Sequence, residues 1–195
     1  MAAVRAQLSV GTTGERDTRR TGTPAVQACG SFSEMISMPR SGPRPAVSNQ
    51  GPQRQLTDRA TPQLWGSVVA RVMALPDVIE GHSQVSPASS RAVFLRDLET
   101  PIVPWTSLAP EGRLEPIHLH GVDDTSVHLC LPAARGSELT ALGWATPHQY
   151  EDFGTEFLIY GPRDDSELDV VLSIVDESIA FALDPGDEQP GHPAT

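Results

Sequence analysis

The chain contains no lysine: all 14 of its basic residues are arginine, set against 25 acidic residues. This absence excludes Schiff-base catalysis and a phosphate-binding loop built on lysine. The two cysteines, Cys29 and Cys130, form no Cys-x-x-Cys pair, which argues against a structural zinc site and fits a reducing compartment. No run approaches the roughly 18 continuous apolar residues of a membrane span, and no apolar signal-peptide segment follows a charged start. We therefore expect a cytoplasmic protein with no membrane partner.

Charge and aromatic content both change near residue 56. Residues 1–56 hold seven arginines and three acids, a net charge of +4, whereas residues 57–195 hold seven arginines and 22 acids, a net charge of −15. Phe32 is the only aromatic residue before residue 57. A segment with so few large apolar side chains cannot offset the entropy of ordering it. We therefore predict a disordered segment over 1–56, a folded domain over 57–183 and a disordered tail over 184–195.

Hydrophobic spacing predicts three helices and four strands in that domain. Thr61 and Pro62 are typical of an N-cap and a first helical residue, and apolar residues at helical spacing follow as far as residue 75. Asp164 and Glu167 have capping-box spacing before the apolar stripe of a last helix. Further elements are predicted as a helix over 133–142 and strands over 91–95, 117–120, 126–131 and 156–160. This order favours an α+β domain: a small, mainly antiparallel sheet with helices packed on one face.

Histidines are concentrated in one part of the chain, since five of the six lie between residues 82 and 148. His118 and His120 are two residues apart on a predicted strand and so share a face. The strands over 117–120 and 126–131 should form a hairpin. In the register that sets His118 opposite His128, His120 lies opposite Ser126, and three imidazoles and a hydroxyl share one surface. A slip of one residue would send His128 to the other face.

This histidine cluster has three interpretations. It is suited to the floor of a pocket that binds a small molecule and moves protons, because an imidazole titrates near neutrality. A His-x-His strand with a third histidine also fits a facial site for iron, zinc or copper. The third interpretation is structural, with half-exposed strand histidines hydrogen-bonded to their neighbours. Spacing alone leaves all three open.

Two other segments offer candidate site residues. Trp144 followed by His148 would supply an aromatic wall and a polar group, although an isolated tryptophan more often packs in a core. Arg163 stands between a predicted strand and the start of the last helix. It would bind a carboxylate or an enolate, although its commoner role is a structural ion pair with a nearby acid.

The order of these motifs resembles that of the fungal-luciferase-like domain family. That family shows a His-x-His, a turn ending in Gly-Ser-x-His, a Gly-Trp-Gly-x-x-His and a Pro-Arg before its last helix. The matching segments are 118–120, 126–129, 143–148 and 160–164, with an opening Leu-Pro-Asp-Val-Ile-Glu-Gly at 75–81. Thr125 and Ala145 stand where the family usually has glycine. The resemblance covers about residues 62–183.

The resemblance implies a pocket that accepts an electron-rich aromatic or enolic molecule. It implies His118, His120 and His128 as catalytic residues, and as substrate-binding residues Ser126, Trp144, His148 and Arg163. Fungal members oxidise a hydroxylated pyrone with molecular oxygen, so the implied activity is that of an oxygenase with no cofactor and no metal. One histidine would take the enolic proton while Arg163 or a second histidine stabilises the anion. Whether this chain is catalytic stays open, because fold resemblance does not carry activity.

An alternative comes from the same opening motif. Residues 75–81 also look like the start of YjbR-type small α+β domains, which are linked to nucleic-acid binding. The alternative is therefore a non-catalytic binding or interaction module. The net charge of −15 after residue 57 would repel phosphates, so we expect no nucleic-acid partner. The expected partner is a small-molecule ligand, and the sequence does not indicate an oligomeric state.

Overall fold

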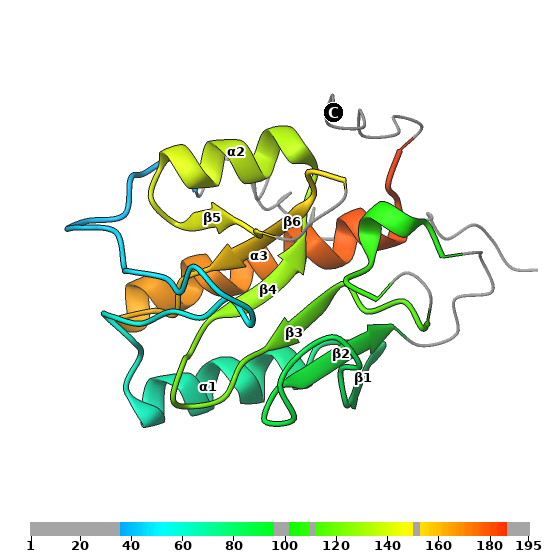
Figure 1. Cartoon of the computed structure of the whole chain (residues 1–195), viewed down its shortest axis with the longest axis horizontal. Coiled ribbons are helices and arrows are strands. Elements are labelled where there is room, and N and C mark those ends of the chain that lie inside the picture. The colour runs from blue at the N-terminus through cyan, green and yellow to red at the C-terminus, as the bar shows by residue number, and fades with distance from the viewer. Residues whose placement is uncertain (1–35, 96–101, 110–111, 150–152, 187–195) are drawn as a thin grey trace, which may run out of the picture. The chain divides into compact units, whose positions relative to one another are not determined.

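The computed structural model describes residues 36–95, 102–109, 112–149 and 153–186. Its centre is a six-stranded antiparallel sheet with the strand order β1-β2-β3-β4-β6-β5 (Figure 1). The strands are β1 (Val78–Gly81), β2 (Arg91–Leu95), β3 (Ile117–Leu119), β4 (Val127–Cys130), β5 (Ala145–Pro147) and β6 (Glu156–Ile159). A short 3-10 helix, η2, covers Pro104–Thr106. The predicted α+β class with a mainly antiparallel sheet is confirmed.

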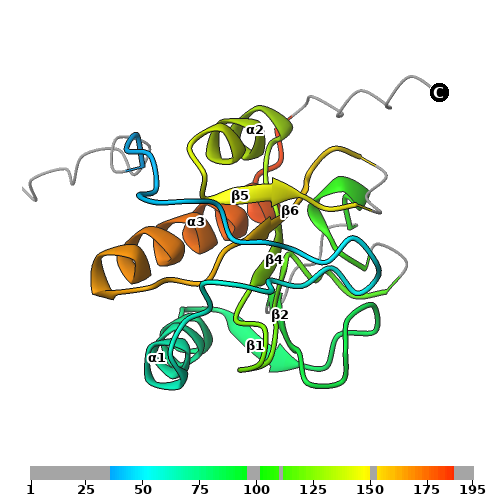
Figure 2. The same cartoon turned by 60° about the vertical axis from the view of Figure 1, so that its left-hand side comes forward.

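Three helices pack on one face of this sheet: α1 (Pro62–Met73), α2 (Ala133–Ala141) and α3 (Asp165–Leu183). Thr61 caps α1 by accepting a hydrogen bond from the Leu64 N–H, and Asp164 caps α3 in the same way. Figure 2 shows α1 and α3 side by side on the same side of the sheet. Apolar residues of all three helices join one core with alternate residues of β3, β4 and β6. No helix among the described residues is long and apolar enough to cross a membrane.

The core fixes the register of the central hairpin. Ile117 and Leu119 of β3 point into the helix-side core, as do Val127 and Leu129 of β4. Because strand side chains alternate, the residues between them must point to the opposite face. His118 pairs directly with His128, which is the register expected from the sequence. A slip by one residue would bury imidazoles in the apolar core, so hydrophobic burial specifies the face on which the histidines lie.

Two strands were not predicted from the sequence. β1 and β5 are the edge strands of the sheet and have four and three residues. β5 ends at Pro147, and proline is tolerated at such a position because an edge strand needs no complete hydrogen-bond ladder. In strands of three or four residues, an alternation of apolar and polar residues cannot be distinguished from chance.

Residues 36–56 differ from the prediction, since they pack against the domain rather than forming a disordered segment. Ile36 belongs to the core, and Arg40 and Gln55 are buried. Gln55 anchors the segment twice: its N–H donates to Asp124 Oδ1 (2.9 Å), and its side-chain carbonyl accepts from the Gly161 N–H (2.8 Å). Composition does not predict that this segment is ordered, because a few specific hydrogen bonds hold it against the domain in place of a large buried apolar surface. Residues 1–35 of the predicted disordered segment, and 187–195 of the predicted tail, lie outside the described residues.

Candidate functional site

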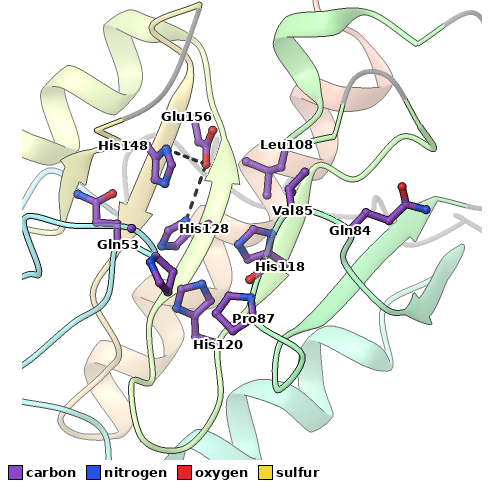
Figure 3. A pocket seen from close by; sticks show the side chains of 13 residues that line it. Gln53, Gln84, Val85, Pro87, Leu108, His118, His120, His128, His148 and Glu156 are labelled. Atoms are coloured by element: carbon purple, nitrogen blue, oxygen red, sulfur yellow. Dashed lines mark ion pairs between the residues drawn. The ribbon is translucent and has the colours of Figure 1, made fainter.

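A cavity of about 780 Å³ lies against the sheet face opposite the helices. Four histidines and Glu156 line it, and Figure 3 shows them converging from β3, β4, β6 and the residues after β5. The rest of the wall comes from loops, at residues 51–53 and 84–87 and at Leu108. The cavity therefore combines apolar side chains with a dense set of imidazoles. Its histidines are His118, His120, His128 and His148.

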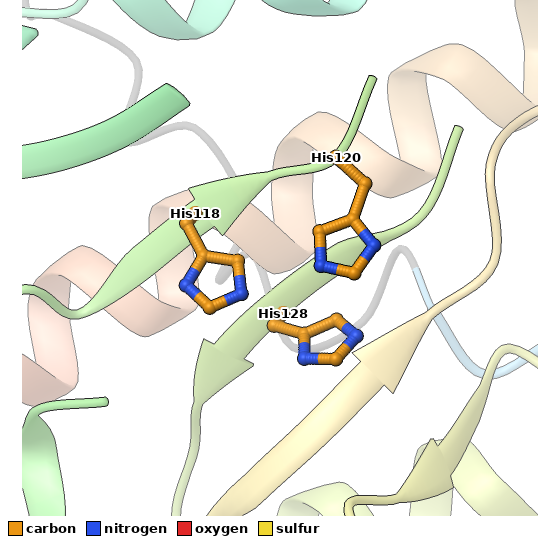
Figure 4. Close-up of side chains that lie close together, drawn as sticks. All are labelled: His118, His120 and His128. Atoms are coloured by element: carbon orange, nitrogen blue, oxygen red, sulfur yellow. The ribbon is translucent and has the colours of Figure 1, made fainter. Parts of the chain in front are cut away.

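His118, His120 and His128 form a stack of imidazole rings (Figure 4). The ring centroids of His120 and His128 are 4.4 Å apart, and those of His118 and His128 are 5.0 Å apart. All three side chains are nearly fully buried. The stack follows from the hairpin register, since directly paired strand residues have close side chains on the same face.

A carboxylate holds one nitrogen of each of two rings. His118 Nδ1 donates to Glu115 Oε1 at 2.9 Å, and His120 Nδ1 donates to Asp124 Oδ2. Because carboxylate oxygens accept these bonds, Nδ1 carries the proton and Nε2 keeps its lone pair. Burial lowers the pKa of His118 below its ordinary value, although the bond to Glu115 works in the opposite direction. His118 is therefore neutral at pH 7 and can accept a proton.

The tight turn between β3 and β4 positions Asp124. Its Oδ1 accepts hydrogen bonds from the Ser126 hydroxyl (2.7 Å) and the Gln55 N–H (2.9 Å). Burial works to raise the pKa of Asp124, but the hydrogen bonds from His120, Ser126 and Gln55 outweigh it, so the pKa lies below its ordinary value. Thr125 has a φ of 59°, in the left-handed region that favours glycine. The Thr125 hydroxyl accepts from the Ala60 N–H at 3.0 Å.

Burial also keeps His128 and His148 neutral in the fold. Burial lowers the pKa of His128 well below its ordinary value, and the neighbouring imidazoles lower it further. Within the part of the chain that the structure describes, His128 Nε2 is buried without a hydrogen-bond partner. Burial lowers the pKa of His148 to about 4. Figure 3 shows Glu156 reaching both rings, with its Oε1 at 3.2 Å from His148 Nδ1 and 3.8 Å from His128 Nδ1.

The structure brings together most of the site residues expected from the sequence. His118, His120, His128 and His148 all line the cavity. Ser126 is buried behind it, and its hydroxyl lies 3.2 Å from His120 Nδ1. Ser126 therefore contacts a pocket histidine and the carboxylate that holds it, and does not line the cavity itself.

Trp144 and Arg163 do not border the cavity, contrary to expectation. Trp144 belongs to the helix-side core, and its indole N–H donates to the Met38 carbonyl at 2.9 Å. Arg163 donates to Glu167 and to the Ser41 carbonyl. Both residues take the commoner structural roles for their types, core packing and an ion pair with a nearby acid.

Sequence reasoning missed the acidic partners of the histidines. Glu115 stands three residues before His118, and Asp124 four residues after His120. Both spacings were visible in the sequence, where a carboxylate near each member of a His-x-His strand signals a ring with a fixed tautomer. Sequence reasoning also missed Gln53, which lines the cavity. No sequence signal pointed to it, because it belongs to the segment for which composition predicts disorder.

Two groups of three side chains in the described residues have metal-ligating atoms close together. The first is His118, His120 and His128, and the second is His128, His148 and Glu156. Within each group, one ligand atom per residue lies within 4.8 Å of the other two. His128 belongs to both groups, so a single ion would select one of them.

Comparison with known proteins gives one family and several relatives. The luciferase-domain model matches residues 113–178. The chain is 30% identical to a luciferase of Armillaria ostoyae over 161 residues, covering 73% of this chain and 60% of that protein. It is 32% identical to a luciferase of Armillaria gallica with the same coverage, and 30% identical over 158 residues to one of Neonothopanus nambi, covering 73% of this chain and 59% of that protein. The chain thus spans about 60% of these relatives' length. No solved structure matches it.

Proposed function

The chain belongs to the luciferase-domain family, and on that premise we propose that its histidine-lined cavity binds a small enolic or aromatic molecule and takes a proton from it. The observation that carries the proposal is the convergence of four imidazole side chains on one cavity of about 780 Å³. The relatives are named luciferases, which describes those proteins. The enolic or aromatic class is the one that the family resemblance implies, and the lining of this chain's own cavity supports it.

The cavity has the size and lining that suit a small organic ligand. Pockets for such ligands usually enclose roughly 300–1,000 Å³ and combine apolar walls with a few placed polar groups. Here Val85, Pro87 and Leu108 supply apolar surface beside the imidazoles (Figure 3). A flat ring with a hydroxyl fits this combination, because its faces contact the apolar side chains while the hydroxyl meets an imidazole nitrogen.

His120 is the proposed proton acceptor. Its Nδ1–H is held by Asp124, so Nε2 is the basic nitrogen, and the lowered pKa of Asp124 keeps that carboxylate ionised beside any imidazolium that forms. Removing a proton from an enolic hydroxyl leaves an anion whose charge is shared with a ring carbon. The imidazolium then stabilises this anion by a charge-assisted hydrogen bond.

Oxidation by molecular oxygen is the proposed next step. The electron-rich carbon of the anion forms a bond to one oxygen atom of O₂. The resulting peroxide anion takes back the proton held by the imidazolium, so the product is a hydroperoxide of the original molecule. The step consumes one O₂ for each ligand and needs no other oxidant.

The test combines binding with oxygen consumption. Purified full-length protein is mixed with a hydroxylated pyrone and, separately, with catechol, and its melting temperature is recorded. A ligand at 100 times its Kd stabilises the native state by about 2.7 kcal/mol, which is a shift of several degrees. Oxygen uptake in the same mixtures is followed with an electrode. We expect at least one compound to raise the melting temperature and to start oxygen uptake.

Two variants make this test specific to the cavity. His128→Gln should lose the ligand-induced shift and the oxygen uptake, whereas His82→Gln should keep both, because His82 is exposed and does not line the cavity. A His128→Gln protein that responds as the unmodified protein does would refute the proposed site. Loss of several kcal/mol of stability in that variant would mark His128 as structural instead.

A further inference from the structure

We propose that His118, His120 and His128 form a binding site for a divalent first-row transition-metal ion, with the cavity side of the ion left open. The family resemblance implied no metal, so this inference rests on the geometry of the described residues alone. One ring nitrogen of each histidine lies within 4.8 Å of the other two, and all three rings are buried side by side (Figure 4). Three imidazoles facing one space are a donor set that zinc, copper, nickel and iron bind.

The carboxylates behind the rings prepare two of the nitrogens for coordination. Glu115 accepts from His118 Nδ1 and Asp124 accepts from His120 Nδ1, so each ring keeps its Nε2 lone pair for another partner. Metal-ligating histidines almost always donate their second ring N–H to a carboxylate, a carbonyl or water. Such a partner fixes the tautomer and makes the ligating nitrogen more basic. His118 and His120, two of the three neighbouring rings, therefore have the carboxylate partner that is typical of metal-ligating histidines.

His128 supplies an independent observation. Its Nε2 is one of five buried side-chain nitrogen or oxygen atoms that have no hydrogen-bond partner among the described residues, and the whole residue is only 2% exposed. Leaving a buried polar atom without a partner costs about 1–3 kcal/mol, so native proteins rarely keep one without a reason. A metal ion bound to this nitrogen would remove that cost.

Charge gives a third argument. Glu115 is 1% exposed and Asp124 is 5% exposed, yet the ion pairs found among the described residues give each of them only a histidine partner. Buried charges are normally paired or coordinate a metal. A dication on the far side of the imidazoles would place two positive charges close to these two acidic side chains.

The spacing is compatible with an ion after small side-chain rotations. A tetrahedral ion with bonds of about 2.1 Å separates its ligand atoms by about 3.4 Å. Moving nitrogens from within 4.8 Å to that separation needs shifts on the order of 1 Å, which changes in the imidazole torsions supply. The cavity lies directly over the rings, so water or an organic anion would fill the remaining position.

The metal site does not depend on the proposed function. A bound ion would occupy the nitrogen that His120 offers as a base in the metal-free protein. Metal binding is measured without any organic ligand, so failure of one proposal is distinguishable from failure of the other.

The experiment uses untagged full-length protein stripped with a chelator. Co²⁺ is added with no organic ligand, the visible absorption spectrum is recorded, and bound metal is counted by mass spectrometry. Zn²⁺ is then added as a competitor. We expect saturation at one Co²⁺ per chain, visible bands typical of low coordination number, and displacement by Zn²⁺. Absence of saturable binding at micromolar Co²⁺ would overturn the proposal.

Matched variants identify the ligands. His118→Gln should abolish the bands, and His82→Gln should leave them unchanged. Glu115→Gln should weaken binding about 10- to 100-fold without removing a ligand, the effect typical of an outer-shell partner. This milder variant keeps the proposal testable if His118→Gln does not fold, which circular dichroism will report. Binding that survives in His118→Gln but is lost in His148→Gln would place the ion in the other group and overturn the assignment.

Discussion

Two buried polar clusters lie in different parts of this domain, and they differ in the groups that donate to their carboxylates and in whether they line the cavity. The histidine cluster consists of His118, His120 and His128 with their carboxylates. The arginine cluster consists of Arg40, Arg163 and Glu167 at the start of α3. Both contain buried carboxylates. In the histidine cluster these carboxylates accept hydrogen bonds from imidazoles. In the arginine cluster the carboxylate accepts hydrogen bonds from guanidinium groups.

In the arginine cluster, opposite charges pair directly, although Arg40 Nε and Nη1 are buried without a hydrogen-bond partner among the described residues. Glu167 accepts from Arg40 (3.0 Å), from the Arg163 backbone N–H (2.9 Å) and from Arg163 Nε (2.9 Å). Burial works to raise the pKa of Glu167, but these bonds outweigh it and the pKa lies below its ordinary value. The Arg40 guanidinium also lies over the rings of Trp144 and Tyr160, at 5.7 Å and 5.4 Å from their centroids.

The comparison separates a structural cluster from a candidate functional one. The arginine cluster joins residues 36–56 to α3 and to the loop after β6, and it does not line the large cavity. The histidine cluster lines that cavity. Among the described residues both clusters contain a buried nitrogen without a hydrogen-bond partner, so position against the cavity, and not an unpartnered nitrogen, marks the histidine cluster as the candidate functional one.

The largest expected effect comes from removing the segment that links both clusters. Deleting residues 1–56 removes Ile36 from the core and Arg40 from Glu167, and it also removes the Gln53 wall of the cavity. Loss of one buried aliphatic side chain costs about 2–3 kcal/mol, and breaking a buried ion pair about 3–5 kcal/mol. Calorimetry should therefore show a melting temperature at least about 10 °C lower, or no cooperative transition.

A second truncation is the control for this effect. Deleting residues 1–35 should leave the melting temperature nearly unchanged, because the composition of that segment predicts no packed core. The difference between the two truncations then measures residues 36–56 alone. Equal melting temperatures for both proteins would contradict a stabilising role for that segment.

The next effect isolates the arginine cluster by one substitution. Glu167→Gln removes the charge that compensates Arg40, whose side chain is 3% exposed, and we expect a loss of about 3 kcal/mol or more in the free energy of unfolding. Asp169→Asn is the matched control, because its pair with Arg71 is exposed and should contribute less than about 1 kcal/mol. Urea unfolding measures both variants. Similar losses in the two would show that burial does not distinguish these ion pairs.

The sequence predicted the part of the fold that repeats a pattern. The strand pair that carries the histidines was predictable because Ile117, Leu119, Val127 and Leu129 alternate with polar residues and must face a core. That alternation favoured the register in which the histidines share a face, and the structure has this register. The capping residue Asp164 likewise predicted the start of the last helix, where its side chain accepts from the Glu167 N–H.

The parts of the fold and of the site that the sequence did not predict depend on contacts between segments far apart in the chain. Arg40 and Glu167 are 127 residues apart, and no local pattern reports such a pair. Trp144 was expected beside the cavity because Gly143 and His148 flank it in the sequence. The chain reverses direction at Gly143, whose φ is 85°, and Trp144 enters the helix-side core while His148 reaches the cavity. Proximity in sequence therefore overstated proximity in space.

The smallest expected effect uses pH to separate the two clusters. His148 has a pKa of about 4 in the fold because of burial, against about 6.5 for an unfolded chain. Between these values the unfolded state binds more protons, so the free energy of unfolding falls as the pH falls. Glu167, with its lowered pKa, stays ionised down to pH 5 and contributes no such change. The loss of stability between pH 7 and pH 5 should therefore come from the histidines.

His148→Gln tests this assignment, because it removes one titrating group while leaving the arginine cluster intact. One proton contributes at most about 1.4 kcal/mol per pH unit, and partial exposure of the His148 side chain reduces that figure. We expect the fall in melting temperature between pH 7 and pH 5 to be smaller by about 1–3 °C in this variant. His82→Gln, at an exposed position, should behave as the unmodified protein does. An unchanged pH dependence in His148→Gln would mean that the His148 ring is not held neutral by burial, and the comparison would then rest on His118 and His128 alone.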